Sequence, residues 1–211
     1  FNGEIFNYLE LREELAARGR AFRTRCDTEV LLQAYAEWGE RCVERFNGQF
    51  AFALWDRDAR RLLLGRDRYG VRPLFLARSG DTLVFASEAK SLLAWPGVER
   101  RLDPARVAEV FTYWAVTGAA TVFAGVSQLP PGHTAVCRPG EPGGGDRPAD
   151  LPDCLTVRRY WHPRFLPARE DARFVGRDER RAMLRRGSYN RATSASCCTR
   201  ETGSSVSMDP V

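Results

Sequence analysis

Apolar side chains recur every three to four positions in two segments near the start of the chain, residues 8–18 and 27–38. This spacing predicts two amphipathic helices. Asn7 and Glu10 have the types and spacing of a capping box for the first helix. Asp27 is a preferred residue type at a helix N-cap and is expected to begin the second helix.

The flanks of these two helices carry turn signals. Phe1 is apolar and is followed by Asn2-Gly3, which predicts a strand and a turn ahead of the first helix. After the second helix, residues 40–46 predict a short further helix that ends at an Asn47-Gly48 turn.

Four short apolar segments then follow one another, and they predict an antiparallel meander of hairpins. The segment "QFAFALW" is apolar at nearly every position, which is typical of a strand covered on both faces. The four segments are residues 49–56, 61–67, 73–79 and 82–88.

The pattern returns to helices and then to one more strand. Helices are expected over residues 87–95 and 103–114, the second with Asp at its N-cap and Pro at its first position. "LPPGH" predicts a turn and "TAVCR" a strand, and residues 138–153 are rich in Gly and Pro, as in a surface loop. Helices and antiparallel strands in consecutive blocks indicate an α+β layered architecture.

The composition indicates a globular protein but does not by itself indicate a function. A chain of 211 residues with 44% hydrophobic and 28% charged residues is typical of a globular protein, and no apolar run is long enough for a bilayer. The net charge of +5 comes mainly from residues 164–211, which hold ten Arg and six acidic residues. Because residues 1–163 hold 22 basic and 21 acidic residues, neither a nucleic-acid partner nor a membrane partner is expected.

Cysteine and histidine give no metal site. The six cysteines have no metal-ligand spacing, and the chain has only two histidines, His133 and His162. We therefore expect reduced, unpaired thiols, a cytoplasmic location and no bound metal.

Five stretches together resemble the glutaminase domain of glutamine-hydrolysing asparagine synthetase. They are "FNGEIFNYLELREEL", "TRCDTEVLLQAYAEWGERCVERFNGQFAFALWD", "GRDRYGVRPLF", "FASEAKSLL" and "LPPGH…RRYW". The resemblance covers residues 1–163 in unbroken order. It implies a partial class II glutamine amidotransferase domain, with an incomplete αββα sandwich of the N-terminal-nucleophile hydrolase type.

The resemblance also implies a glutamine site. It assigns Asn2 and Gly3 to an oxyanion hole, and with Glu4 and Asp27 to binding L-glutamine, the two carboxylates holding the substrate's α-amino group. The chemistry suits these residue types, since an amide N–H and a backbone N–H at a close-packed glycine can stabilise a developing oxyanion. Without the resemblance, Asn2-Gly3 remains interpretable as a common turn and Asp27 as a helix cap.

The resemblance further implies that a catalytic N-terminal cysteine and a glutamine-binding arginine precede the Asn-Gly-Glu sequence in the family. Because neither is found here, we interpret the chain as an N-terminally truncated fragment that is inactive in glutamine hydrolysis by itself. Cys26 has no histidine beside it in sequence and is interpreted as a small structural thiol. His133 is interpreted as a turn residue.

Four further residues match a family motif, and we interpret them as structural. They are expected to form an Arg/Asp pair across a hairpin and a proline at a strand entry. The residues are Arg66, Asp67, Arg72 and Pro73.

Residues 164–211 show no helical or strand periodicity. In the family an ATP-dependent synthetase domain begins here, with a Ser-Gly-Gly-x-Asp-Ser loop that cradles pyrophosphate. The sequence "GSSV" lacks that double glycine and aspartate. The segment is either a frame-shifted remnant of that domain or an unrelated disordered tail, and ATP and Mg²⁺ are expected only in the parent's synthetase domain.

The leading function is therefore the glutaminase portion of an asparagine synthase, which supplies ammonia for ATP-dependent amidation of L-aspartate. Another class II amidotransferase, of the glucosamine-phosphate synthase or amidophosphoribosyltransferase type, is the alternative enzyme. A catalytically dead glutamine-binding or scaffold module is the alternative without activity. The expected partners are L-glutamine, the parent's synthetase domain and, in the parent, a second copy in a homodimer.

Overall fold

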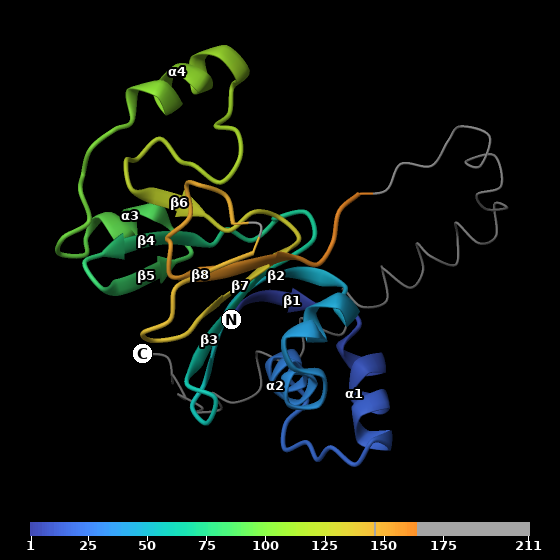
Figure 1. Ribbon diagram of the computed structural model, residues 1–211. Helices are drawn as coiled ribbons and strands as arrows, with labels where there is room; N and C mark the ends of the chain where they lie inside the picture. Colours follow the sequence, from blue (N-terminus) through green and yellow to red (C-terminus); the bar gives the residue numbers. More distant parts are fainter. Residues whose placement is uncertain (146, 164–211) are drawn as a thin grey trace, which may run out of the picture.

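The computed structural model describes residues 1–145 and 147–163, so the two interpretations of residues 164–211 lie outside the described part of the chain. Eight strands and five helical segments make up this part (Figure 1). The strands are β1 (Asn2–Ile5), β2 (Gly48–Asp56), β3 (Arg61–Arg66), β4 (Phe75–Ser79), β5 (Thr82–Ala86), β6 (Val126–Gln128), β7 (His133–Cys137) and β8 (Leu155–Arg159). The helices are α1 (Tyr8–Ala17), α2 (Asp27–Trp38), the 3-10 helix η1 (Gly39–Arg45), α3 (Ala89–Leu93) and α4 (Pro104–Tyr113).

The strands form two antiparallel sheets. The larger sheet has the order β1-β2-β3-β7-β8, and the smaller has the order β5-β4-β6. In β2, Phe50, Phe52 and Leu54 pack toward α1 and α2, while Ala51 packs toward the smaller sheet. The prediction of a strand buried on both faces is thus confirmed.

The layers follow from three buried clusters. One lies between α1, α2, η1 and the larger sheet and includes Leu15, Val30 and Phe50. A second, which we call the inter-sheet core, joins the two sheets through residues such as Leu64 and Leu76. A third packs α3 on the outer face of the smaller sheet. The order of layers is therefore αββα, as predicted, and Figure 1 shows α1 and α2 on one side and α3 on the other.

The predicted four-strand meander is wrong in its pairing. β2 pairs with β3 and β4 pairs with β5, but β3 takes β7 as its second neighbour and β4 takes β6. The cause lies in the connection between β3 and β4. Asp67 accepts backbone hydrogen bonds from Tyr69, Val71 and Arg72 at 3.0–3.1 Å, which folds this connection into a compact loop that leads into the other sheet.

The helix termini match the predictions only in part. Asp103 caps α4 by accepting hydrogen bonds from the backbone N–H groups of Ala105 and Arg106, at 2.9 and 3.4 Å. Asn7 makes no such bond to α1. Its side chain instead accepts from Asn47 N at 2.8 Å and donates to Arg45 O at 3.0 Å, so the expected capping box is wrong and Asn7 joins α1 to the start of β2.

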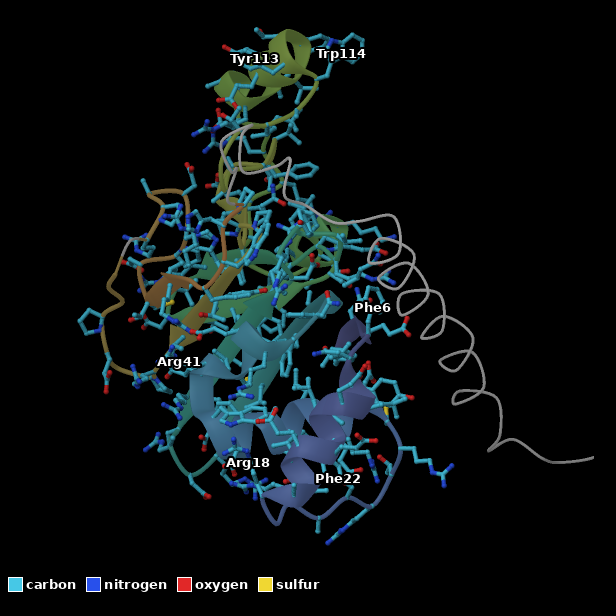
Figure 2. All side chains as sticks on the ribbon, turned by 90° about the vertical axis from the view of Figure 1, so that its right-hand side faces the viewer. Phe6, Arg18, Phe22, Arg41, Tyr113 and Trp114 are labelled. Carbon is cyan, nitrogen blue, oxygen red and sulfur yellow. The ribbon has the colours of Figure 1, made fainter. Side chains whose placement is uncertain are left out.

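Helix α4 stands apart from the layers. None of its residues is buried, and Phe111 and Trp114 are 85% and 93% exposed. Figure 2 shows Tyr113 and Trp114 at the outer end of the helix. Among the described helices, none is long and apolar enough to cross a membrane.

Candidate functional site

The candidate site is built on β1, which is an edge strand of the larger sheet. Asn2 and Gly3 belong to this strand and are paired with Ala51 and Phe50, so the predicted Asn-Gly turn is wrong. The strand approaches β2 so closely that a Cβ on Gly3 would lie 2.0 Å from Gln49 O. Gly3 also has φ of +134°, a conformation that L side chains rarely adopt. Both features explain why glycine stands here.

The hydrogen-bond direction of β1 alternates along the strand. Phe6 N–H donates to Asn47 O at 2.7 Å and therefore points toward the β2 side. Ile5 N–H points the other way and donates to the carboxylate of Asp27 at 3.1 Å. Because alternate residues of an antiparallel strand direct their N–H groups to the same side, the N–H of Gly3 faces the open edge beside Asp27. The backbone thus presents a donor where no strand of the described chain pairs with it.

Asp27 lies across this open edge at the first position of α2. Its side chain does not cap α2, so the alternative interpretation as a helix cap is wrong. One carboxylate oxygen accepts from Ile5 N–H, and the other lies 3.4 Å from the Cys26 thiol. This contact joins residues 22 positions apart and places Asp27 beside the strand that carries Asn2, Gly3 and Glu4.

The loop before α2 is fixed by a carboxylate that the sequence analysis did not single out. Glu29 accepts hydrogen bonds from Arg23 N and Thr24 N, both at 2.7 Å, and from the Thr24 hydroxyl at 2.6 Å. The Thr24 hydroxyl is the first cause that holds the pKa of Glu29 below its ordinary value. In the sequence, this interaction could be recognised from a threonine and a glutamate five positions apart, on either side of the helix start. It fixes the loop that leads into α2 at Asp27.

The charges at the site are negative and uncompensated. Glu4 and Asp27 are half-buried, and neither forms an ion pair with any residue in the described part of the chain. Asn2 is exposed on the same strand as Glu4. Carboxylate oxygens that have no cationic partner can accept hydrogen bonds from an ammonium group, while the Asn2 amide and the Gly3 N–H are donors for a carbonyl oxygen.

The loop after β3 supports the sheet from the inside. Arg66 is 6% exposed and donates to three carbonyl oxygens, those of Gly70, Arg72 and Leu129. Asp67 is fully buried and accepts from backbone groups only. The structural interpretation of these residues holds, but the expected Arg/Asp pair across a hairpin is wrong. Pro73 lies two residues before β4.

Two further groups in the described part of the chain, the Cys42 thiol and the His133 imidazole, lack the features of a catalyst. Burial raises the pKa of the Cys42 thiol to about 12, which makes it inert. His133 is the first residue of β7, its ring nitrogen lies 2.7 Å from Pro131 O, and burial lowers its pKa. Among the described residues there is no cluster of three or more His, Cys, Asp or Glu side chains that could hold a metal ion.

Comparison with known proteins decides the family. The sequence profile of the glutamine amidotransferase domain matches residues 1–142. The chain belongs to this family. The site on β1 and α2 therefore lies in a glutamine amidotransferase domain, and the resemblance drawn from the sequence motifs is confirmed.

The relatives that are similar in sequence are much longer than this chain. Glutamine-hydrolyzing asparagine synthetase 3 of Bacillus subtilis is 38% identical over 163 residues, which cover 77% of this chain and 24% of the relative. A putative glutamine-hydrolyzing asparagine synthetase of Mycobacterium tuberculosis is 36% identical over 190 residues, covering 87% of this chain and 28% of the relative. Amidase chry2 of Gibberella zeae is 34% identical over 140 residues, which cover 66% of this chain and 20% of the relative. The chain thus spans about a quarter of the length of these relatives.

A solved structure is also similar. The glutamine phosphoribosylpyrophosphate amidotransferase from Bacillus subtilis, complexed with ADP and GMP, aligns with 77% of this chain and 28% of its own chain. The sequence identity is 19% and the TM-score is 0.47.

Proposed function

We propose that this amidotransferase domain, residues 1–163, is the glutaminase portion of an asparagine synthase. It would hydrolyse L-glutamine, and the ammonia would be used for ATP-dependent amidation of L-aspartate in a synthetase domain of the parent protein. The observation that carries the proposal is the hydrogen bond from Ile5 N–H to Asp27, which joins β1 to α2 beside the free Gly3 N–H. The similarity to the asparagine synthetases supports L-aspartate as the acceptor of the ammonia, rather than the acceptors of other class II amidotransferases.

Each residue of the site has a distinct proposed role. The carboxylates of Glu4 and Asp27 bind the α-ammonium group of glutamine. The Asn2 side-chain amide and the Gly3 N–H bind the oxygen of the side-chain carbonyl, where negative charge develops in the tetrahedral intermediate. The nucleophile would be the N-terminal cysteine of the family, whose own α-amino group acts as the base.

The cofactors, the oligomeric state and the cellular location are proposed for the parent protein. ATP and Mg²⁺ would bind to its synthetase domain, and a homodimer and a cytoplasmic location are proposed for it. A glutamine-binding scaffold is the second candidate function. It shares the same substrate site and differs only in lacking turnover, so glutamine binding tests the site and an assay of glutamate release separates the two functions.

Asp27→Asn is expected to weaken L-glutamine binding by about 10- to 150-fold, because a hydrogen bond to a charged group contributes about 1.5–3 kcal/mol. Asparagine keeps an oxygen for Ile5 N–H, so the fold should be preserved while the charge is lost. Isothermal titration of the chain measures the affinity. Asp58→Asn, at an exposed position away from the site, is the matched control. Equal affinities for the two variants would contradict the role assigned to Asp27.

A further inference from the structure

Two cysteines lie at the same end of one strand pair. Cys137 is the last residue of β7, and Cys154 directly precedes β8. These strands are antiparallel neighbours, with Cys137 opposite Leu155 (Figure 1). Residues 138–153 therefore leave the sheet at one cysteine and return to it at the other.

The two thiols occupy the same region of the structure. Both side chains are half-buried and pack at the border of the inter-sheet core. Both also line an open cleft at this end of the sandwich, so a small reagent can reach them. The cleft contains none of the four residues assigned to glutamine.

The position of Cys154 is held from the opposite sheet. Arg78 of β4 forms an ion pair with Asp153, the residue before Cys154. The second thiol is thus fixed beside the first by a contact between the two sheets.

We propose that Cys137 and Cys154 form a redox-modification site that a low-molecular-weight disulfide, such as glutathione disulfide, oxidises to an intramolecular disulfide. The observations that carry it are the strand register, the packing of both thiols against the inter-sheet core and their shared cleft. Both thiols are free in the structure.

The reaction balances as two successive thiol–disulfide exchanges. One cysteine loses its proton and attacks a sulfur of glutathione disulfide, which forms a mixed disulfide and releases one glutathione thiolate. The second cysteine loses its proton, attacks the protein sulfur of the mixed disulfide and releases the second glutathione. Two protein thiols are oxidised and one glutathione disulfide is reduced to two glutathiones.

We expect the two thiols to attack in a fixed order. Burial, with Cys154 as its neighbour, raises the pKa of Cys137 to about 11, so this thiol is almost entirely protonated at neutral pH. The thiolate is the attacking species. Cys154 therefore makes the first attack, and Cys137 resolves the mixed disulfide.

Peptide mapping of the oxidised chain tests the proposal. The chain is equilibrated with glutathione disulfide and cleaved before aspartate residues, which places Cys137 and Cys154 on different peptides. The expected product is a disulfide-linked pair of these two peptides that dithiothreitol separates. The same linkage is expected in Cys26→Ser, the matched control for a half-buried thiol outside the pair. Linkage of either cysteine to another partner, or glutathione retained on both, would overturn the proposal.

Single substitutions test the order of attack. Cys137→Ser is expected to accumulate glutathione on Cys154 at least about 10-fold faster than Cys154→Ser accumulates it on Cys137, because the raised pKa of Cys137 limits its thiolate. Mass spectrometry of the intact protein follows both reactions. Equal rates, or a faster reaction at Cys137, would overturn the assigned order, and the wild-type peptide map tests the pair even if one variant fails to fold.

Discussion

Asn2→Ala is expected to lower kcat for glutamine hydrolysis by about 10²–10³ while KM stays nearly unchanged. The reason is that the Asn2 amide is proposed to bind an oxygen whose negative charge exists only in the transition state. A donor of this kind stabilises the transition state more than bound substrate, so its loss appears in kcat. Asn2 is exposed on an edge strand, so removing its side chain should leave the fold intact.

The assay uses the chain extended at its N-terminus by the cysteine-bearing segment of the family, and it measures glutamate release. Asn2→Asp is the matched variant, because aspartate keeps the size of the side chain but replaces the N–H donor with a negative oxygen. Its kcat should fall at least as far as that of Asn2→Ala. A change in KM alone in either variant would show that Asn2 binds the ground state and is not an oxyanion donor.

Gly3→Ala is expected to lower the free energy of unfolding by about 2–4 kcal/mol, the sum of overpacking and an unfavourable backbone conformation. A Cβ at this position would lie 2.0 Å from Gln49 O and 2.7 Å from Phe50 Cα. The two strands must separate to relieve this overlap. Their separation would also displace the Gly3 N–H from the candidate site.

Urea unfolding followed by circular dichroism measures the effect. Gly19→Ala is the matched control, because Gly19 also has positive φ, at +88°, but no atom within 4 Å of the added Cβ. Gly19→Ala should lower the free energy of unfolding by about 1 kcal/mol or less. If the two variants unfold at the same urea concentration, the close approach of β1 to β2 does not constrain residue 3.

Elements whose signal is local were predictable from the sequence. The helical period of residues 27–38 and the aspartate-proline start of α4 needed no information beyond their neighbours. The nearly continuous apolar run over residues 50–55 likewise indicated a strand with two buried faces. Contacts distant in sequence were not predictable in this way. Nothing local indicates that β3 takes β7 as its neighbour, and β6 and β8 were not expected as strands at all.

The candidate site likewise combines features that the sequence predicted with contacts that it did not. The motifs named the residues, but local chemistry alone assigned Asn2-Gly3 to a turn and Asp27 to a helix cap. Both assignments fail because tertiary contacts use the same groups differently. Pairing with β2 extends Gly3 into a strand, and the Asp27 carboxylate accepts from Ile5 N–H on that strand.

The most direct test of the central claim is residue-resolved amide hydrogen exchange of the chain with L-glutamine and with 4-carbamoylbutanoate, which lacks the α-amino group. We expect L-glutamine to slow exchange of the Gly3 amide, which faces the open edge, far more than that of the Glu4 amide, which points toward β2. The analogue should give much weaker protection, because the ammonium group that Glu4 and Asp27 bind is missing. Equal protection by both compounds, or protection confined to the cleft at Cys137 and Cys154, would contradict a glutamine site on β1 and α2.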